Sequence, residues 1–380
     1  MSRCINLFIV ALLILCATGC SEIYYPKVTS NNDFLVVDGL ITNTNEPFVI
    51  KLSKAVKYSD DSIATPKPVS QASLTITDNN NVSYALAETS PGKYTTPPSL
   101  VPRVGNSYKL HIKTAEGNIY ESDYQQLPKP ASYDRITSYN VTESFLDSHK
   151  SLQTTTGADI RIDLSNSSSA ENIKCRFTTN LTVQYMYTRE SYTNYCIAYK
   201  CFGWESGLSL ENNVNITDES SSSSNHSIAN HKVGFIPFAL PAYQAEGELL
   251  SVGQLSTLYY YLKINQYTLN DATFAFYKTA KAQLSASGKI FDPIASQLYS
   301  NIKCTNNPSK LALGFFEASS VTTTAMLIFE RDQKMASSKV PYIEIPQNSL
   351  TQDQLWKCSS QPPFTPHTTP YPDWWGHGIL

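Results

Sequence analysis

Short segments in which apolar and polar residues alternate recur along the first third of the chain, and they restrict its fold more than any other feature. Each segment is rich in β-branched or aromatic residues, and turn-forming Asn, Asp, Pro and Gly residues lie between them. A period of two residues is typical of a strand with one buried face. The segments are 34–42, 48–54, 72–78, 82–87, 108–113 and 118–123. They predict a seven-strand β-sandwich of immunoglobulin-like build over residues 34–127.

The composition agrees with a mainly β protein that has a large core. The chain contains 24 Tyr and 15 Phe, and charged residues make up only 16% of it. Abundant Tyr, Thr, Val and Ile favour pleated, half-buried surfaces over helices. The formal net charge is −3, so we expect no nucleic-acid partner and no attraction to an anionic membrane surface.

Residues 1–19 have the organisation of a lipoprotein signal peptide. Arg3 precedes an apolar run, and the small residues 17–19 lead directly to Cys20. The run is too short to stay in a membrane, since crossing about 30 Å of hydrocarbon needs roughly 20 apolar residues. Cleavage before Cys20 would expose this cysteine for acylation, for example with palmitate. The alternative is an ordinary secreted protein with a chance cysteine at the cleavage point.

The rest of the chain divides into a tether, a second domain and a tail. Residues 20–33 are polar and predict an extended tether behind the lipid. The proline-containing stretch 127–130 closes the first domain, because proline fixes its own φ and restrains the preceding residue. Strand-like segments then continue through a larger β-rich domain, residues 131–345, with one amphipathic helix near 269–286. Residues 346–380 form a proline-rich tail.

Five cysteines remain once the signal peptide and Cys20 are set apart. They are Cys175, Cys196, Cys201, Cys304 and Cys358. An exported chain meets an oxidising compartment, which predicts one or two disulfides and leaves one thiol over. The spacing does not select their pairing. The C-x4-C of Cys196 and Cys201 lacks the second Cys or His pair that zinc usually needs, so we expect no metal site.

The sequence contains no recognisable catalytic motif. Its six histidines lack a metal-ligand spacing, and it has neither a G-x-S-x-G elbow nor a phosphate-binding loop. We therefore expect a protein that is not an enzyme and has no cofactor. A hydrolase is the least favoured alternative, because nothing in the sequence singles out a pair of catalytic carboxylates. It stays open because the fold, and not sequence spacing, sets the distance between two such carboxylates.

Aromatic residues gather in two regions that suggest recognition surfaces. Tyr185, Tyr187, Tyr192 and Tyr195 form one group, and the adjacent Trp374 and Trp375 in the tail form the other. Exposed aromatic rings supply large, rigid contact areas and are enriched at binding sites. Packing inside the core or on a sheet face is the simpler explanation for most of the tyrosines, and docking of the tail on the protein body is the favoured explanation for the tryptophans.

Three longer strings carry a resemblance to a known family. They are FLVVDGLITNTNEPFVIKLSKA, TITDNNNVSYALAETSPGKYTTP and QYTLNDATFAFYKTAKAQLSASGKIFDPIASQLYSNIKC, and the last continues into KLALGFFEAS. Roughly residues 30–345 resemble the outer-membrane lipoproteins of Bacteroidota that are catalogued as domain of unknown function 4249 (DUF4249).

The resemblance implies a location and partners but no molecular activity. The family's lipoproteins are anchored in the outer membrane, often at the cell surface rather than on the periplasmic face, and are commonly encoded beside a TonB-dependent β-barrel transporter. The resemblance also marks Cys201 and Cys304 as structural cysteines. Ser62 lies in Asp-Ser-Ile, which resembles an O-glycosylation signal of exported proteins in these bacteria.

These features predict a non-enzymatic lipoprotein that assists a TonB-dependent transporter, either by capturing a ligand or by helping the complex to assemble. The alternative from another functional class is a stand-alone surface adhesin or glycan-binding protein. Its binding platform would be the tyrosine group at 185–195, since aromatic rings suit sugar rings.

Overall fold

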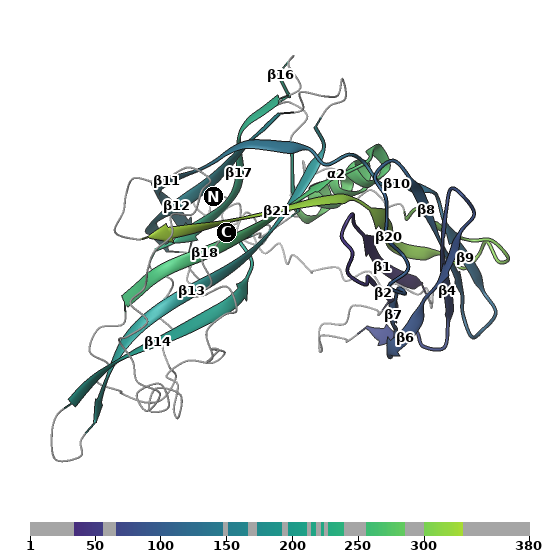
Figure 1. Ribbon diagram of the computed structural model, residues 1–380, viewed down its shortest axis with the longest axis horizontal. Coiled ribbons are helices and arrows are strands. Elements are labelled where there is room, and N and C mark those ends of the chain that lie inside the picture. The colour runs from purple at the N-terminus through teal and green to yellow at the C-terminus, as the bar shows by residue number, and fades with distance from the viewer. Residues whose placement is uncertain are drawn as a thin grey trace, which may run out of the picture. The chain divides into compact units, whose positions relative to one another are not determined.

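The computed structural model describes most of the chain between residues 34 and 329. The described ranges are 34–55, 66–146, 151–165, 173–191, 197–210, 214–217, 222–223, 227–238, 256–285 and 300–329. They form strands with one helix among them, so the prediction of a mainly β fold is confirmed (Figure 1). Within these ranges, no helix has both the length and the apolar character that crossing a membrane requires.

Two sheets enclose a first core, and we call this unit the first sandwich. One sheet has the strand order β20-β1-β2-β7-β6, with β3 beside β2, and the other has the order β19-β9-β8-β4-β5, with β10 beside β8. The strands are β1 Leu35–Ile41, β2 Val49–Lys54, β3 Lys67–Pro68, β4 Ser73–Asp78, β5 Ser83–Ala85, β6 Ala87–Ser90, β7 Lys93–Thr95, β8 Ser107–Lys113, β9 Ile119–Ser122, β10 Gln125–Gln126, β19 Ile302–Cys304 and β20 Ala312–Ala318.

The first core forms because alternate residues of these strands turn to the same side. Leu35, Val37 and Ile41 of β1 are buried in it together with Leu110 and Ile112 of β8. The intervening residues of both strands are more accessible to solvent. The sequence pattern therefore identifies the buried side of these strands, while the immunoglobulin-like build stays a prediction.

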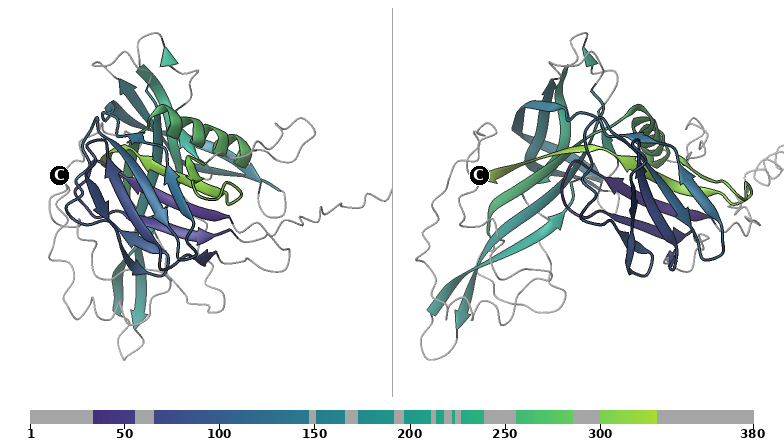
Figure 2. Two further views of the ribbon diagram at one scale, coloured as in Figure 1. Left: turned by 90° about the vertical axis from the view of Figure 1, so that its right-hand side faces the viewer. Right: turned by 45° about the vertical axis from the view of Figure 1, so that its right-hand side comes forward.

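The first sandwich is completed by strands from far along the chain, which the predicted division into residues 34–127 and 131–345 does not include. Strand β20 pairs with β1 in parallel, from Leu35 opposite Ala312 to Ile41 opposite Ala318, and β19 pairs with β9 (Figure 2). The period of a segment reports which side is buried but not which strand lies beside it. The sequence pattern therefore placed the segment 311–318 in the wrong domain.

A second pair of sheets encloses the second core, and we call this unit the second sandwich. The β12 sheet has the order β11-β12-β17-β16, and the β13 sheet has the order β14-β13-β18-β21, with β15 beside β13. The strands are β11 Ser132–Leu146, β12 Leu152–Ser165, β13 Cys175–Ser191, β14 Ile197–Leu208, β15 Asn215–Ile216, β16 Ser222–Ser223, β17 Ser227–Pro237, β18 Ser256–Thr268 and β21 Ser320–Phe329. Side chains of both sheets meet in one hydrophobic cluster, which includes Ile160, Ile236, Phe177 and Leu262.

Helix α2 (Asp271–Ser285) lies within the predicted range 269–286. Asn270 caps it, because the backbone N–H of Thr273 donates to Asn270 Oδ1 at 2.9 Å. Figure 2 shows the helix beside strand β20, and the rings of Phe276 and Phe315 have centroids 4.6 Å apart. The helix thus packs on a strand of the first sandwich, although it follows β18 of the second.

A buried ion pair joins strand β13 of the second sandwich to strand β20 of the first. Arg176 Nη2 lies 3.3 Å from Glu317 Oε1, and both side chains are largely buried. The Arg176 guanidinium also contacts the rings of Tyr267 and Tyr277, at 4.3 and 4.6 Å from their centroids. The Tyr277 hydroxyl donates to Glu317 Oε2 at 2.6 Å. Burial, reinforced by the charge of Glu317, raises the pKa of Tyr277.

Cys175 and Cys304 are buried free thiols, which differs from the predicted disulfides at these two positions. Cys175 belongs to the second core and Cys304 to the first, so apolar packing accounts for each of them. Burial raises the pKa of Cys175 to about 12, which leaves its thiol protonated and unreactive. The Cys201 side chain, Cys196 and Cys358 lie outside the description, and disulfides there stay a prediction.

Replacing Gly314 with Ala tests the close approach of β20 to β1. Gly314 has a φ of +84°, and a Cβ there would lie 2.0 Å from the carbonyl oxygen of Val37. We expect Gly314→Ala to lower the free energy of unfolding by about 3 kcal/mol in chemical denaturation, from the clash plus the backbone strain. The control is Gly105→Ala, because Gly105 has a φ of +88° with nothing within 4 Å of its Cβ position. Equal losses in the two variants would contradict the close approach.

Candidate binding face on the second sandwich

The outward side of the β12 sheet carries a row of charged side chains. Along β12, Ala158, Ile160 and Ile162 are fully buried in the second core. Because successive residues of a strand point to opposite sides, Asp159 and Arg161 project from the outward side. Strand β12 lies between β11 and β17, so side chains from three strands meet there.

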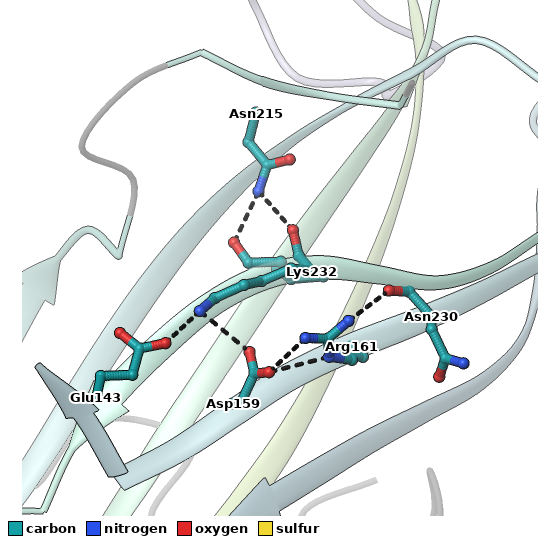
Figure 3. A network of polar contacts seen from close by, with 7 residues as sticks. Glu143, Asp159, Arg161, Asn215, Asn230 and Lys232 are labelled. Atoms are coloured by element: carbon teal, nitrogen blue, oxygen red, sulfur yellow. Dashed lines mark hydrogen bonds and ion pairs between the residues drawn. The ribbon is translucent and has the colours of Figure 1, made fainter. Parts of the chain in front are cut away.

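Figure 3 shows how these side chains connect. Asp159 Oδ2 accepts hydrogen bonds from Arg161 Nε at 2.9 Å and from Arg161 Nη2 at 2.8 Å, and Arg161 Nη1 donates to the carbonyl oxygen of Asn230 at 3.1 Å. Lys232 Nζ lies 3.5 Å from Asp159 Oδ1 and forms an ion pair with Glu143. Residues from β11, β12 and β17 therefore form one continuous polar network.

Asp159 is the most buried charged residue of this network. Its side chain is only 6% exposed, and its Oδ1 atom is buried and makes no hydrogen bond within the described part of the chain. Lys232, at 3.5 Å, balances the charge of Oδ1 without donating a hydrogen bond to it. Buried polar atoms are almost always hydrogen-bonded in folded proteins. The Oδ1 atom of Asp159 can therefore accept a further hydrogen bond.

Two aromatic residues flank Asp159 in the same row of the sheet. Tyr139 of β11 and Phe235 of β17 are its partners in the strand register. A Cβ added to Gly157 would lie 2.5 Å from Phe235 Cζ, so the Phe235 ring occupies the space that the glycine leaves. Tyr139 is 45% exposed. We call the surface formed by Tyr139, Glu143, Asp159, Arg161, Lys232 and Phe235 the candidate binding face.

A second ion pair supports this face from further along β12. Arg135 donates to Asp163 Oδ2 through Nη2 at 2.7 Å and through Nε at 3.1 Å. The backbone N–H of Asn230 donates to Asp163 Oδ1 at 2.7 Å. That backbone hydrogen bond and the bonds from Arg135 lower the pKa of Asp163, although partial burial opposes the shift. Asp163 therefore fastens β11 and β17 to β12 as a carboxylate.

The outer ends of β11 and β12 form a ribbon that extends beyond β17. Strand β17 pairs with β12 only from Gly157 to Ser165. Residues 152–155 of β12 pair only with β11 among the described strands. Phe145 is 49% exposed and Leu152 is 71% exposed in this ribbon. We call residues 143–146 and 152–155 the projecting ribbon. It presents apolar side chains to solvent.

The structure describes few of the site residues predicted from the sequence. Tyr185 and Tyr187 lie in β13, opposite Gly203 and Cys201 of β14, but their side chains fall outside the description. The other predicted site residues outside it are Cys20, Ser62, Tyr192, Tyr195, Trp374 and Trp375. Their roles stay predictions. In the part that is described, no three His, Cys, Asp or Glu side chains are grouped so as to hold a metal ion.

The sequence does contain a signal for the candidate binding face, in the alternation of Ile160 and Ile162 with charged residues. That pattern is typical of any strand with one solvated side. It does not show that Asp159 is buried, because burial depends on which strands lie beside β12, and the local pattern does not specify them.

Asp163→Asn tests the electrostatic support of this face. The folded-state pKa of Asp163 lies below its ordinary value near 3.8. Its contribution to stability is therefore complete above that value and is lost as the pH falls through the lowered pKa. We expect Asp163→Asn to lower the free energy of unfolding by about 1–3 kcal/mol at pH 7 and to flatten its decline in acid. Denaturant titrations between pH 2 and 7 measure both effects.

The control for this prediction is Asp123→Asn. Asp123 is well exposed and lies 3.4 Å from Lys303, and exposed pairs of this kind contribute about 0–1 kcal/mol. If the free energy of unfolding of Asp163→Asn declined in acid as steeply as that of the wild type, Asp163 would not support the face as a carboxylate.

The comparisons with known proteins give one match. The family model described as domain of unknown function (DUF4249) matches residues 21–325. No curated protein and no solved structure matches the chain. The family match spans both sandwiches and well over half of the 380 residues, and the chain therefore belongs to the DUF4249 family.

Proposed function

We propose that the protein is a non-enzymatic lipoprotein of the outer membrane that binds a TonB-dependent β-barrel transporter as an accessory subunit. The observation that carries the proposal is the projecting ribbon with its exposed apolar residues. The signal-peptide pattern that ends at Cys20 supports the membrane location. The family's implied association with such transporters supports the choice of partner.

The projecting ribbon has the properties of a contact element. Two paired strands without further support are marginally stable in water, yet this ribbon also exposes Phe145 and Leu152. Leu152 lies opposite Leu146 in the register, so Phe145 and Leu152 project from opposite sides of the ribbon, and a partner that encloses the ribbon from both sides would cover both of them. Burying both side chains in an interface would gain roughly 1.5–3 kcal/mol for each fully buried residue.

The lipid anchor raises the effective concentration at which the projecting ribbon meets a barrel in the same membrane. A tether over residues 20–33, fully extended, reaches at most about 50 Å. An anchored protein and a barrel in the same membrane thus meet at a raised effective concentration, so a modest interface suffices for a stable complex.

Affinity purification of the tagged, lipidated protein from its own membranes in mild detergent tests the proposal. We expect mass spectrometry to find a TonB-dependent barrel in near-stoichiometric amount. The double variant Phe145→Ser, Leu152→Ser should lose most of this barrel. The matched control is Val82→Ser, because Val82 is 47% exposed and lies between β4 and β5 of the first sandwich. Cys20→Ser should abolish palmitate labelling and also reduce barrel recovery.

Each arm of this experiment can contradict a part of the proposal. Wild-type protein that purifies without any barrel excludes the accessory role. Barrel recovery that is equal for the ribbon double variant and for Val82→Ser excludes the projecting ribbon as the contact.

A further inference from the structure

We propose that the candidate binding face is a binding site for a neutral saccharide, with Tyr139 and Phe235 as stacking residues and Asp159 as a hydrogen-bond acceptor. This site goes beyond the transporter contact and does not depend on it. It is also a different candidate from the tyrosine group at 185–195 that the sequence suggested as a platform, since it belongs to the β12 sheet and the backbone of Tyr185 and Tyr187 belongs to the β13 sheet.

The spacing of the two rings suits sugar units. Tyr139 and Phe235 lie on the strands on either side of β12, each in register with Asp159. Neighbouring strands are about 4.8 Å apart, which places the two positions about 10 Å apart. The C–H groups on one side of a sugar ring pack on an aromatic ring, so two aromatic residues at backbone positions this far apart can hold two linked sugars. A few polar groups between apolar walls are typical of small-molecule sites.

Asp159 supplies the polar contact between the rings. Its Oδ1 atom is buried, has no hydrogen bond within the described residues and lies 3.5 Å from Lys232 Nζ. A sugar hydroxyl that donates to Oδ1 would form a charge-assisted hydrogen bond, which is stronger than one between neutral groups. The Lys232 side chain is 43% exposed and flexible, so it can move aside and donate to a neighbouring hydroxyl.

The charges on this side of the sheet favour a neutral ligand. Within the candidate binding face and the ion pair that supports it, three carboxylates and three cations form ion pairs with one another, so the formal charges of these six groups cancel. They are Glu143, Asp159, Asp163, Arg135, Arg161 and Lys232. A phosphate or an amine would have to separate existing ion pairs and leave one charge without a partner. A saccharide exchanges hydrogen bonds with these groups and keeps the charges balanced.

The Phe235 ring is held in place before a ligand arrives. It fills the space above Gly157, and Lys232 Nζ lies 5.7 Å from its centroid. A ring that is already ordered loses little entropy on binding, which favours affinity.

The test is binding of the purified, lipidated chain in detergent to a panel of neutral oligosaccharides, namely malto-, cello-, xylo-, manno- and galacto-oligosaccharides. Sulfated oligosaccharides and inorganic phosphate serve as charged probes. We expect at least one neutral oligosaccharide to bind in isothermal titration calorimetry. Tyr139→Ala and Asp159→Asn should each weaken that binding by roughly tenfold or more, and Tyr139→Phe should retain it, because its ring still stacks.

Tyr124→Ala is the matched control. Tyr124 is 48% exposed and belongs to the first sandwich, between β9 and β10. Because Tyr139 is an exposed side chain, Tyr139→Ala should keep the wild-type melting temperature. This separates loss of binding from loss of folding even where Asp159→Asn is destabilised.

Three outcomes overturn the proposal: no neutral oligosaccharide binds, the charged probes bind more tightly than the neutral ones, or Tyr139→Ala binds as tightly as Tyr124→Ala. The purified chain is measured without a barrel, so failure here leaves the transporter contact unaffected. Failure to recover a barrel likewise leaves this site unaffected.

Discussion

The buried ion pair between Arg176 and Glu317 is the interaction on which the rest of the architecture depends. A buried ion pair adds little net stability, but removal of one partner leaves an uncompensated charge and costs about 3–5 kcal/mol. Here the pair selects which strands lie together, because Arg176 belongs to β13 and Glu317 to β20. Strand β21 begins just after Glu317 and pairs with β18, next to β13. Glu317 thus lies next to the point where the chain leaves one core and enters the other.

The rings of Tyr267 and Tyr277 help to stabilise the charged guanidinium of Arg176 in the interior. Burial by itself would lower the pKa of Arg176, but the charge of Glu317 and the two tyrosines outweigh burial and raise it. The guanidinium therefore stays charged. Its Nε atom has no hydrogen bond within the described part of the chain, so the tyrosine ring contacts supply part of what water would provide.

Local patterns in the sequence were enough to identify strands such as β1 and β8 and helix α2, but they gave no signal for β11 or β14. The alternation in β1 and β8 and the cap at Asn270 act within a few residues, and local physics determines them. The parallel pairing of β1 with β20 has no such local signal, which is why the segment 311–318 was placed in the wrong domain. The candidate binding face was missed for a similar reason. Asp159 resembles an ordinary solvated strand residue until Tyr139 and Phe235, from two other strands, are placed beside it in the register.

The pairing of β1 with β20 also sets the order in which the protein can fold. Leu35 is among the first described residues to be synthesised, but its partner Ala312 emerges near the end of the described chain. Until then, β1 has an open edge beside an incomplete core, which is the type of surface that pairs with other chains and aggregates. A chain cut short before residue 312 would lack β20 and keep the edge of β1 unpaired. Such a truncated chain would therefore stay prone to aggregation in a way that the chain with β20 in place is not.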